Sequence, residues 1–166
     1  EIAPIIRGAV ALPADNPGGE PTRFVMTFRT GPEILAYVNG AELSDYSQRG
    51  VVTPDHIIRT KNTPLVVSPP EPGRLDEFAK HVKEAVAEFS AGYESYFERE
   101  NDKVGGIKSK LDSAPRVVLV PGLGLFGIGR SAAERAHIGV EGVGKAGRER
   151  GRIVAELGGA ADDLVV

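Results

Sequence analysis

The chain has 166 residues, of which 41% are hydrophobic, and its 20 basic and 23 acidic side chains give a net charge of −3. This size and composition predict an α/β protein with one packed core. The absence of cysteine excludes disulfides, thiol catalysis and metal sites built on thiolates. The acidic balance argues against nucleic acid or an anionic membrane as a partner, and no apolar run reaches the roughly 18 residues of a membrane helix.

Turn clusters and short apolar segments alternate in the first part of the chain. An apolar stretch covers residues 2–12, and the prolines and glycines of residues 13–21 predict an exposed loop. Residues 23–28 and 63–68 are rich in β-forming residues and predict two strands. A helix is expected over residues 32–40, because this segment begins with a proline suited to the first helical turn and ends with an Asn-Gly pair.

The strongest helical signal covers residues 74–100. Its apolar residues recur every three or four positions along one face. Asp76 and Glu77 lie in the first turn, where the helix dipole favours anions. We expect this helix to pack its apolar stripe onto a sheet or another helix, and a polar linker to follow over residues 101–115.

The last predicted elements are a hairpin and a helix. Residues 116–120 predict a buried strand, residues 121–124 a turn, and residues 125–129 a second extended segment. Ser131 and Glu134 have the spacing of a capping box at the head of a helix, which several glycines then weaken.

The glycines of the hairpin also match a dinucleotide-binding pattern, with Gly122, Gly124 and Gly127 in the order G-x-G-x-x-G. In a dinucleotide site the helix starts within the glycine turn, so that its first amides meet the pyrophosphate. Here the capping box places the helix start at Ser131, and the residues between are apolar. A strand–turn–strand hairpin therefore explains these glycines better than a nucleotide site.

One turn-rich segment concentrates groups that can bind an anion. Asp55, His56, Arg59 and Lys61 provide a carboxylate, an imidazole and two cations close together in the sequence. Such a set can recognise a phosphate, or its members can orient one another. The alternative is a hydrogen-bonded turn between two strands. No His-x-His, HExxH or other zinc-ligand spacing occurs among the three histidines, so the sequence predicts no metal site.

Four groups of residues carry a resemblance to a known family. They are RGA at residues 7–9, GVVTPDHIIRTK at 50–61, YFER at 96–99 and PRVVLVPGLGLFGIG at 115–129. In this order they resemble one region of the bacterial bifunctional aldolase/short-chain dehydrogenase family, the rhamnulose-phosphate aldolase/alcohol dehydrogenase type. That region lies between a zinc domain of the class II aldolase/adducin type and a Rossmann dehydrogenase domain. The resemblance covers most of residues 1–136 and implies a three-layer, mixed-sheet α/β fold like that of the class II aldolases and adducin.

The resemblance implies an accessory role. In the aldolase frame the turn between the two strands holds a zinc-ligating histidine, and the matching residue here is Leu123, which has no lone pair for zinc. We therefore expect a non-catalytic region of a bifunctional sugar-phosphate aldolase/dehydrogenase, serving in assembly, domain spacing or substrate shielding. Zinc and NAD are then expected only in neighbouring domains. The expected partners are those domains of the same polypeptide and further copies in a homo-oligomer.

An active site stays open as the alternative. In that case the segment 55–61, together with the turn glycines Gly122 and Gly124, binds a sugar phosphate or cleaves it as a lyase. In either case we expect one domain over residues 1–166, with a less regular tail over 137–166. The start at Glu1 without a methionine indicates a processed chain or a fragment of a longer one, and no secretory signal opens the sequence. The absence of cysteine fits a reducing, cytoplasmic setting.

Overall fold

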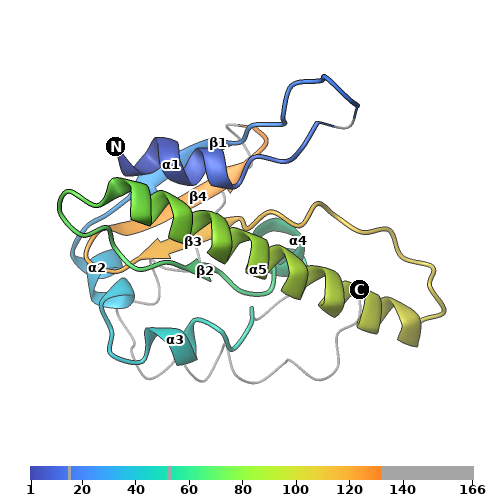
Figure 1. Ribbon diagram of the computed structural model, residues 1–166. Coiled ribbons are helices and arrows are strands. Elements are labelled where there is room, and N and C mark those ends of the chain that lie inside the picture. Colours follow the sequence, from blue (N-terminus) through green and yellow to red (C-terminus); the bar gives the residue numbers. More distant parts are fainter. Residues whose placement is uncertain (15, 52–53, 132–166) are drawn as a thin grey trace.

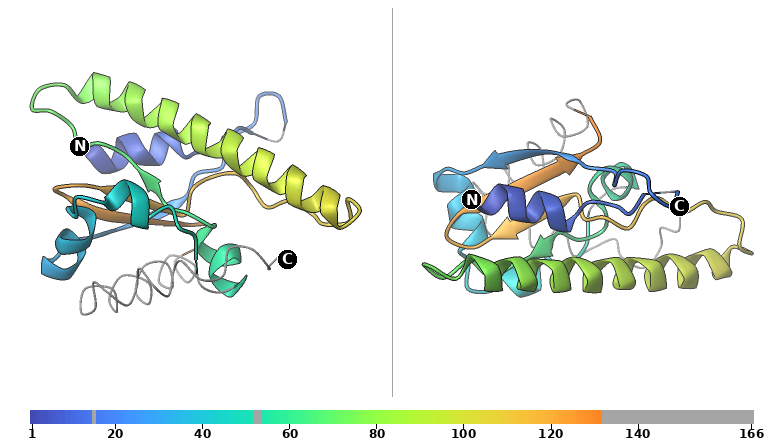
Figure 2. Two further views of the ribbon diagram at one scale, coloured as in Figure 1. Left: turned by 90° about the horizontal axis from the view of Figure 1, so that it is seen from below. Right: turned by 45° about the horizontal axis from the view of Figure 1, so that its top comes forward.

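The computed structural model describes residues 1–14, 16–51 and 54–131, apart from the side chains of residues 54–56. It is a mixed α/β fold in which helices pack on both faces of a four-stranded sheet (Figures 1 and 2). The elements in chain order are α1 Ile2–Ala9, β1 Val25–Arg29, α2 Pro32–Val38, α3 Leu43–Tyr46, α4 Pro54–Thr60, β2 Leu65–Val66, α5 Leu75–Lys103, β3 Val117–Val120 and β4 Gly124–Gly129. The helix expected after Ser131 and the tail lie outside the described residues.

The predicted hairpin forms the centre of the sheet, whose strand order is β1-β4-β3-β2. Strand β4 pairs antiparallel with both β1 and β3, whereas the two-residue strand β2 pairs parallel with β3. One row of paired residues crosses all four strands and consists of Phe28, Phe126, Val118 and Leu65. Because side chains alternate between the two faces of a strand, this row lies on a single face.

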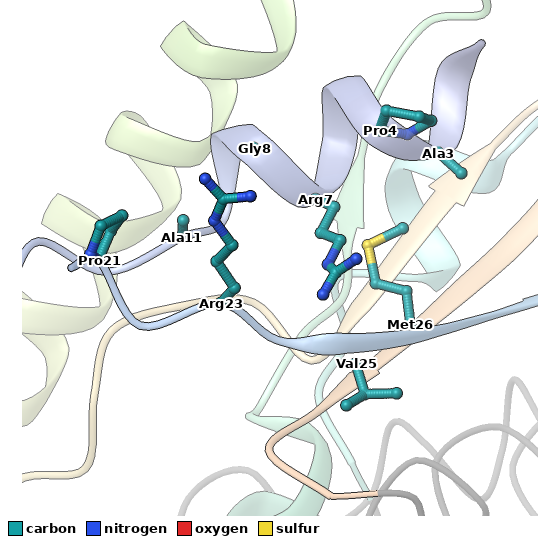
Figure 3. Close-up of a pocket in the computed structure, with 9 residues that line it drawn as sticks. All are labelled: Ala3, Pro4, Arg7, Gly8, Ala11, Pro21, Arg23, Val25 and Met26. Atoms are coloured by element: carbon teal, nitrogen blue, oxygen red, sulfur yellow. The ribbon is translucent and has the colours of Figure 1, made fainter.

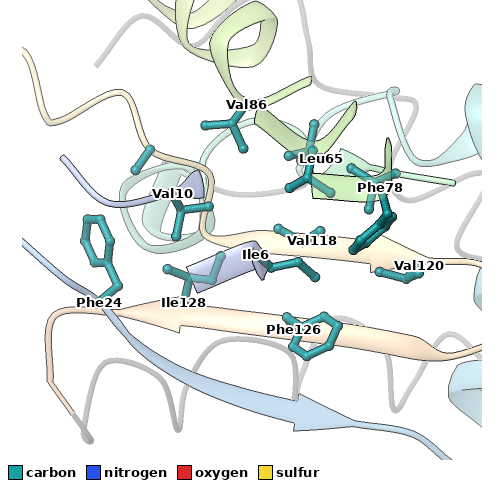
Figure 4. Close-up of a cluster of buried hydrophobic side chains, with 13 residues drawn as sticks. Ile6, Val10, Phe24, Leu65, Phe78, Val86, Val118, Val120, Phe126 and Ile128 are labelled. Carbon is teal, nitrogen blue, oxygen red and sulfur yellow. The ribbon is translucent and has the colours of Figure 1, made fainter. Parts of the chain in front are cut away.

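Helices α1 and α5 cover that face and form the main core with it (Figures 1 and 4). Ile6 of α1 and Val82 of α5 are fully buried against Val118 and Ile128 of the central hairpin. The predicted apolar stripe of α5 is thus confirmed in its first half, where Phe78 is buried as well. Burying each such side chain contributes about 1.5–3 kcal/mol of transfer free energy.

The opposite face carries a second, smaller core. Val38 of α2 and Leu43 of α3 are buried there against Leu119 and Leu125, which are paired residues of β3 and β4. These side chains have the opposite strand parity to the first core, as the period of two requires. The arrangement confirms an α/β fold with a mixed sheet and helices on both sides.

The structure of residues 50–61 differs from the prediction, which was a turn-rich segment that either binds an anion or forms a hydrogen-bonded turn between two strands. Helix α4 occupies residues 54–60 instead. Pro54 suits the first helical position, because the N–H that proline lacks has no partner there in any case. The helix ends where Lys61 adopts a left-handed backbone with φ of 66°. The apolar stretch near the N-terminus, to which no element was assigned, contains helix α1.

The second half of α5 extends beyond the sheet (Figure 1). The chain then returns alongside it, and the Ser90 hydroxyl donates a hydrogen bond to the Ser113 carbonyl oxygen, while Lys110 pairs with Glu94. Tyr93 is half-buried between helix and returning segment. In the part of the chain that the structure describes, no helix is both long and apolar enough to cross a bilayer.

Gly8, inside helix α1, has open space around it, because a Cβ added there meets nothing within 4 Å. We expect Gly8→Ala to raise the free energy of unfolding by about 0.5–1 kcal/mol, since glycine loses more backbone entropy in a helix than alanine does. Urea denaturation measures the change. Gly73 has equally open space but a φ of +77°, so Gly73→Ala should have the opposite sign. Equal signs for both variants would contradict this explanation.

Candidate functional site

The predicted site residues fall into two groups at opposite ends of β3. Gly122 and Gly124 form the turn that follows β3, whereas Lys61 lies at the other end, where its amine contacts the chain just before β3. Arg59 lies beside Lys61, in the last turn of α4. The described residues therefore do not bring the glycine turn and the basic segment into one site. Asp55 and His56 belong to α4, and their side chains lie outside the described part.

The glycine turn is a tight hairpin turn, as predicted. The Leu123 amide donates to the Val120 carbonyl oxygen at 3.0 Å, and Gly122 at the third turn position has a φ of +78°, as a type II turn requires. The Gly122 amide donates to Asn39 Oδ1 at 2.6 Å, which fixes the turn to the C-terminus of α2. The side chain of Leu123 packs against the core under α1 and α5. The turn amide is thus occupied by the protein itself.

Lys61 is only 3% exposed, which is unusual for a lysine. Its Nζ donates to the main-chain oxygen of Asp112 and lies 3.8 Å from the centre of the Tyr93 ring. Burial lowers the pKa of Lys61 to about 8, although the negative charge of Asp112 opposes this shift. The amine therefore connects the end of α4 to α5 and to the segment before β3.

Asp112 is the centre of a charged cluster that sequence reasoning missed. Its Oδ2 accepts hydrogen bonds from Arg116 Nη2 at 2.6 Å and from Arg130 Nη2 at 3.0 Å, and its Oδ1 accepts one from the Ala114 amide at 3.2 Å. Burial acts to raise the pKa of Asp112, but the hydrogen bond and charge of Arg116 and the other cations outweigh it and lower the pKa. We call Lys61, Asp112, Arg116 and Arg130 the Asp112 cluster.

The predicted hairpin contained a signal for part of this cluster. Arg116 directly precedes β3 and Arg130 directly follows β4, and the ends of an antiparallel pair lie side by side. The Ile128 amide indeed donates to the Arg116 carbonyl oxygen at 2.8 Å. Asp112, in contrast, lies in the segment predicted to be a linker. The Arg116 guanidinium also lies 4.9 Å from the centre of the Phe24 ring, in a cation–π contact.

The buried amine of Lys61 should make stability depend on pH. Between the folded pKa of about 8 and the usual value of 10.5, the unfolded chain holds more protons than the folded one. The free energy of unfolding therefore rises as the pH increases through this window. We expect the urea midpoint to increase from pH 8 to 9.5 and this increase to be lost in Lys61→Met.

Lys80→Met is the matched control, because the Lys80 side chain is 79% exposed. This variant should keep the wild-type slope. The measurement stops at pH 9.5 because of Tyr37, whose pKa burial raises to about 12. Above about pH 10 the tyrosine loses its proton in the unfolded chain before it does so in the folded one, and the free energy of unfolding then falls with pH. A slope that persists in Lys61→Met would assign the titration to another group.

The glycine turn has no side chains that can coordinate zinc, the metal that the resemblance places in a neighbouring domain. Leu123 offers a hydrocarbon side chain, and Gly122 and Gly124 offer none. Among residues 1–14, 16–51 and 57–131, whose side chains the structure describes, no group of three or more histidine, cysteine, aspartate or glutamate side chains is placed to hold a metal ion.

These observations define an α/β protein built on a central hairpin whose turn is held by α2. The chain belongs to the class II aldolase second-domain family, because the family model described as "Aldolase class II, second domain" matches residues 1–146. The similarity to class II aldolases that the sequence motifs indicated is thereby confirmed.

A curated relative extends this relationship to oxidoreductases. The "Uncharacterized oxidoreductase YuxG" of Bacillus subtilis (strain 168) is 33% identical to this chain over 133 residues. The matched part covers 80% of this chain and 18% of that protein, so the chain spans less than a fifth of the relative's length. No solved structure matches the chain.

Proposed function

We propose that this chain is a non-catalytic, accessory domain of a bifunctional sugar-phosphate aldolase/dehydrogenase, of the rhamnulose-phosphate aldolase/alcohol dehydrogenase type. The observation that carries the proposal is the position of Leu123. The aldolase frame has a zinc-ligating histidine in this turn, whereas Leu123 is half-buried and packs its side chain against the main core. A side chain in that position contributes to folding and supplies no donor atom to a metal.

In this proposal the domain keeps the three-layer aldolase/adducin-like fold and lies between a zinc aldolase domain and a Rossmann dehydrogenase domain. Those neighbours bind the zinc and the NAD. The relative named as an oxidoreductase supports this arrangement, because the match takes up only 18% of its length and leaves room for further domains. The domain then serves in assembly, spacing or substrate shielding, in a cytoplasmic homo-oligomer.

The alternative, a sugar-phosphate site in the segment 55–61, has less support from the geometry. Lys61 already donates to the Asp112 carbonyl oxygen and lies over the Tyr93 ring. The glycine turn that was to complete the site lies at the far end of β3. His56 and Arg59 stay candidate ligands under this alternative.

Two measurements separate the proposals. Elemental analysis of the 166-residue chain should find no stoichiometric zinc, and a ketose phosphate or NAD(P) should not shift its melting temperature. In the full protein that contains this chain, His56→Ala/Arg59→Gln should keep kcat/KM for aldol cleavage within about twofold of wild type. Stoichiometric zinc with aldol cleavage by the chain alone would overturn the accessory role. A large loss of kcat/KM in a folded double variant would favour the alternative.

A further inference from the structure

A groove between α1 and the edge strand β1 has no part in the accessory role. Its volume is about 570 Å³, within the range of small-molecule sites in proteins. Small or apolar residues form most of its lining, among them Ala3, Gly8, Ala11 and Met26 (Figure 3). Two arginines, Arg7 from α1 and Arg23 from the segment before β1, complete it.

Both guanidinium groups lie in the space between α1 and β1 (Figure 3). Arg7 is held in place, because its Nε donates to the Phe24 carbonyl oxygen at 2.9 Å. Within the described part of the chain, neither Arg7 nor Arg23 has a carboxylate within the 4.0 Å of an ion pair. Most other arginines of the described part are paired, including Arg49, Arg74, Arg99 and Arg116.

Arg7 and Arg23 are both exposed, and together they give one groove of a net acidic protein a local positive charge that favours an anion from outside the described chain. A guanidinium presents a planar fork of donors that matches the oxygens of a phosphate or a carboxylate. Apart from the two arginines, the residues that line the groove include no hydroxyl, amide or carboxylate side chain, so they offer few partners for the several hydroxyl groups of a sugar. They offer an apolar surface instead.

We propose that this groove binds a small organic anion with an apolar body. Its phosphate or carboxylate group lies between Arg7 and Arg23, and its apolar part lies on Ala3, Ala11 and Met26. This site is separate from the segment 55–61 and from the glycine turn. A test of this groove is therefore independent of the test of the accessory role.

Gly8 offers a variant that fills the groove without disturbing the fold. It lines the groove and lies in α1, and a Cβ added there meets nothing within 4 Å. A leucine at this position occupies the space of the ligand, while its high helix propensity supports α1. Loss of binding in Gly8→Leu with an unchanged or raised melting temperature cannot come from unfolding.

The test is isothermal titration of the full protein with phenyl phosphate and with benzoate. Inorganic phosphate and phenol serve as comparison ligands that carry the charge alone or the ring alone. We expect the ring-bearing anions to bind more tightly than either comparison ligand. The ratio of the dissociation constants of phenyl phosphate and benzoate then distinguishes a phosphate site from a carboxylate site. Arg23→Gln should weaken binding about tenfold, the effect of losing one charged hydrogen bond.

Arg99→Gln is the matched control, because it removes one guanidinium at the distant end of α5 and should leave the affinity unchanged. Gly8→Leu should abolish the binding. Failure of both ring-bearing anions to bind at millimolar concentration would overturn the proposal. Binding that persists in Gly8→Leu would also overturn it, because that binding lies elsewhere in the protein.

Discussion

Replacing Asp112 by alanine is expected to lower the free energy of unfolding by about 3–5 kcal/mol. The Asp112 and Arg116 side chains are only 11% and 10% exposed, so their charges are poorly solvated. Without the carboxylate, the buried cations Arg116 and Lys61 repel each other and lose their nearest counter-charge, and only the smaller effect of Glu94 on Lys61 remains. Urea denaturation with a two-state fit measures the loss.

Asp45→Ala is the control for this variant. Asp45 also forms an ion pair with an arginine, Arg49, but its side chain is 60% exposed. Exposed pairs contribute between 0 and about 1 kcal/mol, so Asp45→Ala should change stability by no more than that. A cost of under 1 kcal/mol for Asp112→Ala as well would mean that water screens the Asp112 cluster.

Gly124→Ala should destabilise the protein by about 3 kcal/mol or more, for a steric reason. Gly124 has a φ of +138°, and a Cβ added there would overlap the carbonyl oxygen of Arg29 on the neighbouring strand. Because that oxygen belongs to the backbone, β1 itself has to shift away from β4. The loss of its pairing is measurable as a lower urea midpoint and as faster amide exchange in β1.

Gly122→Ala separates backbone strain from the steric contact. Gly122 also has a positive φ, of +78°, but its added Cβ meets nothing within 4 Å. We expect it to cost only the roughly 1–2 kcal/mol of a left-handed conformation. Equal losses in Gly122→Ala and Gly124→Ala would show that conformation alone, and not the approach of β1, determines the effect.

Elements whose signals are local were predicted from the sequence. The periodic stripe predicted a helix over 74–100 where α5 occupies Leu75–Lys103, and the Pro-Gly turn predicted the hairpin of β3 and β4. The strand order was beyond prediction, because β1 pairs with β4, a strand distant in sequence. Helix α4 was missed because its initial proline and aspartate are equally common in turns.

The candidate site was predictable only in part, for similar reasons. The tight glycine turn and its lack of a metal ligand follow from residues 121–124 alone. The burial of Lys61 follows from tertiary packing, since its partners Tyr93 and Asp112 lie on α5 and on the segment before β3. Arg7 was noticed only within a family motif, because nothing in the local pattern shows that α1 places it beside Arg23.

The strand order has a consequence for synthesis on the ribosome. Strand β1 lies at the sheet edge and pairs with β4. Val25 therefore has no pairing partner until Gly129 has been synthesised, about 100 residues later. At roughly 5–20 residues per second, that wait is on the order of 5–20 s. Ile6 of helix α1 is synthesised still earlier, 122 residues before Ile128, which it helps to bury. Strand β4, one of the two central strands of the described sheet, is thus the last of the four to be made, and the earlier segments stay exposed to chaperones and proteases until it emerges.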